Sequence, residues 1–233
     1  AFDEYLVRLA AQAGADVLEQ TQVMSLALER SGCNVTVKTQ QSGANGVILK
    51  AKHIIGADGA NGICARCGSL RRKRSLAIAV ETEMPFSFDS GHEFIRQDTA
   101  HLEFGAVRAG YAWIFPKRGK INVGAGAFNH QSAKKIYGAG LGPALRQAVV
   151  DYLRALDVPV NPPELRFWMH PLPIWAGREP LSTPDGELLL AGDAAGLINP
   201  FFGDGIMHAV RSGKIAADCL LNDAPGSYTA EIH

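Results

Sequence analysis

A strand-to-helix crossing near the carboxyl end constrains the fold of this chain more than any other feature. The run ELLLA at residues 187–191 is apolar and predicts a buried strand, and residues 206–221 are small and apolar at helical spacing. Between them lies a loop with four glycines and two aspartates, GDAAGLINPFFGDG over residues 192–205. Open α/β sheets bind ligands at the carboxyl ends of their strands. The crossing therefore predicts an α/β fold with a ligand site in this loop.

The composition of the loop suits a flat, polar ligand. Glycine lacks the side chain that would hold the backbone away from a ligand. The first N–H groups of the following helix are unpaired donors with partial positive charge. A plain glycine-rich turn is the structural alternative. The candidate ligand-binding residues are Gly192, Asp193, Gly196, Pro200, Gly203, Asp204, Gly205 and Ile206.

A second loop of small residues follows an earlier apolar run. Residues 56–59 read GADG directly after a strand predicted to end at residue 55. Asp-Gly is common in turns, so a helix-capping turn is the alternative to a ligand-binding role for Asp58 and Gly59. We expect Asp58 and Asp193 to meet at one ligand. That arrangement places strands near 15–19, 48–55 and 187–191 in the same or directly contacting sheets.

The rest of the chain divides into helical and β-rich stretches. Helical spacing of apolar residues predicts helices over 2–13 and 141–156, and alternation predicts a hairpin whose turn is the small-residue cluster at 42–46. Closely spaced β-rich runs predict an antiparallel sheet. These runs are 76–83, 101–107, 111–116 and 121–127.

This pattern predicts two domains. Residues 1–67 and 180–233 are expected to form one α/β domain, and residues 68–179, with helix 141–156, an inserted and mainly antiparallel β-sheet domain. The proline-rich stretch 171–184 is expected to cross between them.

An aromatic strand is the third candidate site. Residues 110–117 read GYAWIFPK and are followed by INVGAG at 121–126. Because side chains alternate along a strand, Trp113 and Phe115 fall on one face. Core packing and ligand lining explain this pair equally well from the residues alone.

Together these motifs resemble the geranylgeranyl reductase family of FAD-dependent oxidoreductases, within the flavoprotein class that includes aromatic hydroxylases. The run GDAAGxxNPxxGxGI is similar to the second FAD-binding motif of that class, GADG to its middle motif, and YxWxFPK followed by NVGxG to a pattern of geranylgeranyl reductases. The resemblance covers most of residues 1–220.

The resemblance implies a role for each motif. Asp193 is expected to bind the ribityl chain of FAD, the segment Gly203 to Ile206 to line the isoalloxazine, and Asp58 to lie near the pyrophosphate and ribose. A hydrophobic substrate channel is expected to be lined by Tyr111, Trp113, Phe115 and Pro116. The implied reaction is hydride transfer from reduced flavin to an isoprenoid carbon–carbon double bond, with NAD(P)H or another reductant as electron donor. No residue is assigned as catalytic.

The sequence also departs from the family. No strand followed by GxGxxG and a helix is present, so we expect a Rossmann-like domain that lacks its first βαβ unit. We expect the chain as given to lose FAD and to have little reductase activity. The alternatives are an FAD-dependent aromatic monooxygenase, which the WxFPK run disfavours, an electron-transfer flavoprotein that feeds a quinone, and an inactive fragment.

Charge and cysteine content exclude other classes. The chain has 23 basic and 23 acidic residues, so it has no nucleic-acid footprint, and no apolar run approaches the roughly 18 residues of a membrane span. We expect a cytoplasmic protein acting on a lipid-like molecule, with peripheral membrane contact as an option. The CxxC at Cys64 and Cys67 is half a zinc site at best, so no metal is predicted. Nearby arginines favour a redox dithiol, and two incidental thiols are the alternative.

Overall fold

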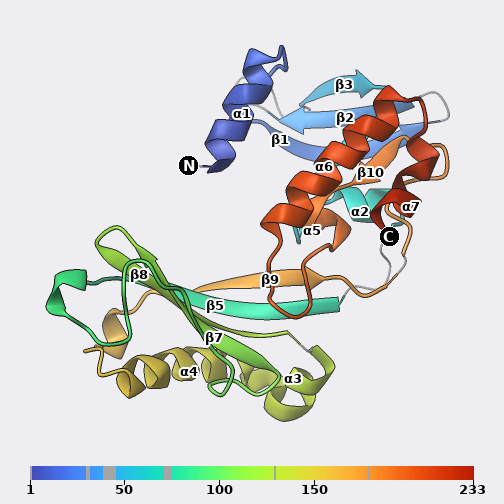
Figure 1. Cartoon of the computed structure of the whole chain (residues 1–233). Helices are drawn as coiled ribbons and strands as arrows, with labels where there is room; N and C mark the ends of the chain where they lie inside the picture. The colour runs from blue at the N-terminus through green and yellow to red at the C-terminus, as the bar shows by residue number, and fades with distance from the viewer. Residues whose placement is uncertain (1, 30–31, 39–45, 71–74, 129, 178) are drawn as a thin grey trace.

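The computed structural model describes residues 2–29, 32–38, 46–70, 75–128, 130–177 and 179–233, and it has two parts (Figure 1). An α/β part holds both ends of the described chain, and a five-stranded sheet backed by helices lies beside it. Among the described residues, no helix is long and apolar enough to cross a lipid bilayer.

The α/β part contains two small sheets. Strands β1, β2 and β3 form an antiparallel meander, whereas β4 and β10 pair in parallel. Leu188, Leu189 and Leu190 of β10 are completely buried, and the hydroxyl of buried Tyr228 donates to the Leu190 carbonyl oxygen at 2.5 Å. The elements are α1 (Phe2–Gln12), β1 (Gln22–Glu29), β2 (Gly32–Lys38), β3 (Val47–Ala51), β4 (Ile54–Gly56), α2 (Cys64–Cys67), β10 (Leu188–Leu190), α5 (Gly192–Ala195), α6 (Ile206–Leu221) and α7 (Tyr228–Ile232).

The second part is an antiparallel sheet in the order β6-β7-β8-β5-β9. Because side chains alternate, one face packs on α4 and the other turns toward the α/β part (Figure 1). The face toward α4 contributes Val80, Ile114 and Val123 to a core shared with Leu145 and Val149. The elements are β5 (Ser75–Pro85), β6 (His101–Glu103), β7 (Gly110–Lys117), β8 (Lys120–Ala127), α3 (His130–Tyr137), α4 (Leu141–Ala155) and β9 (Trp168–Ile174), with single 3-10 turns at Phe88–Ser90, Gly138–Gly140, Pro162–Glu164 and Pro225–Ser227.

The two parts meet where the loop after α5 lies against β9. The backbone N–H of Trp175 donates to the Ile198 carbonyl oxygen at 2.9 Å, and the N–H of Ile198 donates to the Pro173 carbonyl oxygen at 3.4 Å. The hydroxyl of Tyr111, on β7, donates to the Phe202 carbonyl oxygen. These contacts hold the sheet against the loop that leads into α6.

Most predicted elements are confirmed. The three helices predicted over 2–13, 141–156 and 206–221 are α1, α4 and α6, and the hairpin is β2 paired with β3. The β-rich runs do form an antiparallel sheet, although the run 101–107 is a strand only to residue 103. The turn at 42–46 falls largely outside the described residues. The division at residues 67/68 and 179/180 stays a prediction.

Three strand predictions are wrong in detail. Residues 15–19 form no strand, and the positive φ of 51° at Gln20 interrupts the extended run before β1 begins at Gln22. The predicted strand 48–55 is two strands, β3 and β4, in different sheets. Pro171 and Pro173 belong to β9 rather than to a crossing segment. They are tolerated because β9 is an edge strand and needs hydrogen bonds on one side only.

The CxxC pair does not favour a thiolate at its first cysteine. Cys64 is buried at the start of α2, and burial, followed by a side-chain hydrogen bond with Asp58, raises the pKa of its thiol to about 12. This direction is opposite to the one a redox dithiol requires. Cys67, at the end of the same helix, is exposed.

This difference predicts selective alkylation at pH 8. Iodoacetamide reacts with thiolates, so Cys67 should be labelled while Cys64 stays protonated and shielded. Peptide mass spectrometry after short exposure measures the labelling, and all four cysteines should react in urea. Equal labelling rates at Cys64 and Cys67 in the folded protein would contradict the buried position of Cys64.

Candidate functional site

The parallel pairing of β4 and β10 brings two predicted motifs to one edge. Gly56 is opposite Leu190, and the N–H of Ala191 donates to the Gly56 carbonyl oxygen at 3.0 Å. Asp58 and Asp193 follow these positions by two and three residues. The expectation that their strands lie side by side is therefore confirmed.

Asp58 caps the short helix α2. Its Oδ2 accepts the backbone N–H of Ile63 at 2.6 Å and that of Cys64 at 2.9 Å. A Cβ at Gly62 would lie 2.0 Å from the Asp58 carboxyl carbon, so glycine is required there. The helix-capping alternative raised from the sequence is present. Asp58 is still exposed, and Gly59 beside it has a left-handed φ of 74°.

The loop glycines are needed for the backbone conformation and packing of the protein itself, in addition to their proposed role in ligand binding. Gly192 and Gly196 have left-handed φ values of 57° and 67°, and α5 ends at Gly196. The N–H of Gly192 donates to Ser212 Oγ at 3.0 Å, which ties the loop to α6. A Cβ at Gly203 would lie 2.3 Å from the Phe128 ring. These glycines permit α6 and the sheet to approach the loop closely.

Asp193 and the start of α6 lie together. A Cβ at Gly205 would be 3.3 Å from Asp193 Oδ1, which places the half-buried carboxylate beside the first turn of α6. Gly205 is the N-cap residue and provides no side-chain hydrogen bond to that turn. The partial positive charge of a helix start makes this turn a favourable place for an anionic group.

A cavity of about 780 Å³ opens at this helix start. Its size is within the range of about 300–1,000 Å³ that is typical of ligand sites. Arg211 and Lys214 add positive charge to it. Four predicted cofactor-binding residues line this cavity together with α1 and α6, and the full lining is Phe2, Gly203, Asp204, Gly205, Ile206, Met207, Val210, Arg211 and Lys214. Pro200 lies elsewhere, in a second cavity on another side of α6.

The aromatic strand is only partly arranged as predicted. Trp113 and Phe115 share a face and stack with ring centroids 6.1 Å apart, as expected. Trp113 and Tyr111 are 7% and 5% exposed, whereas Phe115 is 40% exposed. Pro116 is opposite Ile121, on the face that packs toward α4. The structure therefore does not bring Pro116 to the side of the other three.

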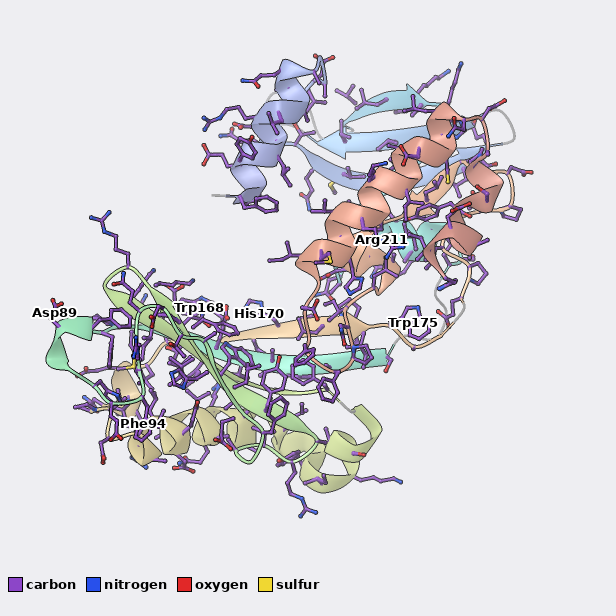
Figure 2. The ribbon with its side chains drawn as sticks, in the orientation of Figure 1. Asp89, Phe94, Trp168, His170, Trp175 and Arg211 are labelled. Atoms are coloured by element: carbon purple, nitrogen blue, oxygen red, sulfur yellow. The ribbon has the colours of Figure 1, made fainter. Side chains whose placement is uncertain are left out.

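Trp113 is held by a chain of polar side chains that sequence reasoning missed. Its indole N–H donates to Asn122 Oδ1 at 2.9 Å, and Asn122 Nδ2 donates to Glu81 Oε2 at 3.1 Å. His170 Nε2 is 3.2 Å from Glu81 Oε1. Figure 2 shows His170 and Trp168 on β9, at the side of the sheet turned toward the α/β part. A lone asparagine within the small and apolar run of β8 was the available signal.

The glycines of β8 leave space for the rings of Trp113 and Phe128, which pack directly on the strand. A Cβ at Gly124 would lie 2.1 Å from the Trp113 ring, and one at Gly126 would lie 2.8 Å from the Phe128 ring. Further along the same face, Lys117 and Lys120 both pair with Glu83, which lowers the pKa of that carboxyl. Within the described part of the chain, no three His, Cys, Asp or Glu side chains could together hold a metal ion.

Two solved structures have the same fold. A geranylgeranyl bacteriochlorophyll reductase-like protein from Thermoplasma acidophilum matches with a TM-score of 0.73 and 22% identity over 99% of this chain and 57% of that one. CmlS, a flavin-dependent halogenase, matches with a TM-score of 0.67 and 19% identity over 100% of this chain and 41% of that one. At these identities the likeness shows the fold alone.

Curated relatives are more similar in sequence. A digeranylgeranylglycerophospholipid reductase of Methanocaldococcus jannaschii is 32% identical over 222 residues, which are 93% of this chain and 52% of the relative. An uncharacterized protein of Methanosarcina barkeri is 30% identical over 94% of this chain and 50% of the relative. The chain thus spans about half the length of the curated relatives it matches.

The family model described as FAD binding domain matches residues 1–221. The match includes both loops at the β4 and β10 edge, the start of α6 and the aromatic strand. The chain therefore belongs to the FAD binding domain family and is related to digeranylgeranylglycerophospholipid reductases.

Proposed function

We propose that this chain binds the flavin end of FAD and takes part in reducing isoprenoid carbon–carbon double bonds. The observation that carries the proposal is the uncapped start of α6, which opens into a cavity lined by Gly203, Asp204 and Gly205. The relatives named as digeranylgeranylglycerophospholipid reductases support the substrate class.

The residues present fit a flavin. The partial positive charge at the start of α6 suits the N1–C2=O edge of a reduced, anionic ring, and Arg211 and Lys214 add positive charge. Asp193 lies beside this helix start, where its carboxylate can accept a hydrogen bond from a ribityl hydroxyl. Asp58 and Gly59 are proposed to support the cofactor nearer its pyrophosphate.

When bound, the flavin supplies the hydride, and the chain supplies binding, orientation and exclusion of water. Trp113 and Phe115 present stacked rings on the sheet face turned toward the α/β part. Phe115 is exposed enough to touch a substrate directly, whereas buried Trp113 shapes the wall behind it. The electron donor, NAD(P)H or another reductant, is part of the proposal.

Flavin titration tests the role of Asp193. Asp193→Ala removes an acceptor of a charge-assisted hydrogen bond, worth on the order of 1.5–3 kcal/mol, so the flavin Kd should rise roughly ten- to a hundredfold. Quenching of flavin fluorescence at micromolar concentrations measures the Kd for both FAD and FMN. Asp151→Ala, on the exposed face of α4, is the matched control. An unchanged Kd for Asp193→Ala would remove Asp193 from the site, and the absence of any saturable flavin binding by the parent chain would overturn its proposed role.

A stability measurement tests the hydrogen bond between Trp113 and Asn122. Asn122→Ala leaves the buried indole N–H without its acceptor, which should lower the free energy of unfolding by about 1–3 kcal/mol. Urea denaturation measures this change, and Gln147→Ala on the surface of α4 should cost less than about 0.5 kcal/mol. If both variants cost equally little, the hydrogen bond does not hold Trp113 in place.

Product analysis tests the reaction. Reduced flavin and a lipid with geranylgeranyl chains are incubated with the protein, and mass spectrometry identifies the products. A reductase adds two hydrogens for each double bond, whereas a monooxygenase supplied with oxygen adds an oxygen atom. Phe115→Ala should slow saturation of the lipid by about tenfold while the flavin Kd stays constant. A hydroxylated product would favour the monooxygenase alternative instead.

A further inference from the structure

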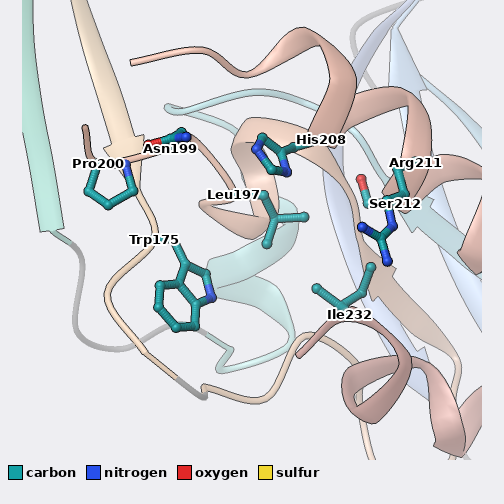
Figure 3. A pocket seen from close by; sticks show the side chains of 8 residues that line it. All are labelled: Trp175, Leu197, Asn199, Pro200, His208, Arg211, Ser212 and Ile232. Carbon is teal, nitrogen blue, oxygen red and sulfur yellow. The ribbon is translucent and has the colours of Figure 1, made fainter. Parts of the chain in front are cut away.

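A second cavity lies on another side of α6, separate from the helix start. It has a volume of about 420 Å³ and is bounded by the segment after β9, the loop after α5, the first two turns of α6, and α7 (Figure 3). Its lining is Trp175, Leu197, Asn199, Pro200, His208, Arg211, Ser212 and Ile232. The cavity at the helix start shares only Arg211 with this set.

The walls of this cavity are largely apolar. Leu197 is buried, Ile232 is half-buried, and the indole of Trp175 forms the opposite side (Figure 3). The indole N–H of Trp175 donates to His233 Nδ1 at 3.4 Å, and this contact fixes the ring where it borders the cavity. A flat apolar body can therefore lie between Trp175 and the side chains of Leu197 and Ile232.

The polar groups still available in the cavity are donors. Arg211 has no hydrogen bond or ion pair with any residue that the structure describes, and its guanidinium stays charged. Asn199 Oδ1 already accepts the N–H of Phe201 at 2.8 Å, so the side-chain NH₂ is the group of Asn199 that can donate to a ligand. Ser212 Oγ is satisfied because it accepts from Gly192 and donates to Ala209.

The charge in the cavity is positive. None of the eight lining residues is acidic. Outside the lining, the Asp204 carboxylate Oδ2 is 3.9 Å from His208 Nε2. Arg211 has no ion pair with a described residue, so its guanidinium is complementary to an anion.

From this arrangement we infer that the cavity binds a small organic acid whose body is flat and apolar. The carboxylate pairs with Arg211, assisted by His208 and the Asn199 amide, and the body lies against Trp175. Ligand sites of this kind combine apolar walls with a few convergent polar groups. This site shares Arg211 with the cavity proposed for the flavin, but none of its other lining residues, and it does not depend on the proposed reaction.

The test compares an acid with its neutral analogue. The probes are 2-naphthoate and 2-naphthalenemethanol, which share a ring system and differ in charge. Titration of the ¹⁵N-labelled chain follows the indole N–H signal of Trp175, assigned with the Trp175→Phe variant. We expect a saturable shift and a Kd for the acid about tenfold lower than for the alcohol.

Two variants place the binding site. Arg211→Gln should raise the Kd for the acid about tenfold, to that of the alcohol, and leave the alcohol unchanged. Lys214→Gln should change neither, because Lys214 lines only the cavity at the helix start. Both side chains are on the surface of α6, so circular dichroism should be unchanged. Equal affinities for acid and alcohol, or a loss with Lys214→Gln as large as with Arg211→Gln, would overturn the inference.

Discussion

The backbone bonds between Ile198 and the end of β9 are the constraint on which the rest of the structure depends. They attach the loop after α5 to the last strand of the antiparallel sheet, and the Tyr111 hydroxyl adds a bond to the same loop at Phe202. Together with the packing of the Phe128 ring on Gly203, they join the helix start at Gly205 to the aromatic face of the sheet. Because of them, one short loop fixes the positions of both.

The close packing around this loop explains why residues 192–205 include so many small residues. Gly192 must admit Ala209 of α6, since a Cβ there would lie 3.1 Å from the Ala209 side chain, and Gly203 must admit the Phe128 ring. The loop is therefore compressed from the helix on one side and from the sheet on the other. Gly203 also lines the cavity at the start of α6. Internal packing and access for a ligand thus require the same residue type at this position.

Local patterns in the sequence were sufficient to predict the elements with strong periodicity and clear ends. Helices α1, α4 and α6 begin and end within about two residues of the predicted positions. That the strands before Asp58 and Asp193 lie in the same or contacting sheets followed from two loops of small residues after apolar strands. The strand predicted at 15–19 was wrong because the positive φ at Gln20 interrupts the extended backbone. Pro171 and Pro173 were not assigned to a strand because the sequence does not show that β9 is an edge strand, where proline is tolerated.

The candidate site was predictable only in its local parts. Residues 203–206 could be proposed from one continuous glycine-rich stretch of sequence, and they line one cavity. The support of Trp113 comes from Asn122, Glu81 and His170 on three different strands, and no local pattern links them. No local pattern predicts the cavity beside α7 either, because Trp175, Arg211 and Ile232 come together only after folding.

The prolines of β9 affect whether copies of the molecule can associate through the edge of the sheet. An incoming strand pairs with an edge by accepting its free N–H groups, and proline has none. Two of the seven residues of β9 are proline. At the opposite edge, β6 is only three residues long. Both edges of the five-stranded sheet are thus poor templates for a further strand, which protects this sheet from edge-to-edge association.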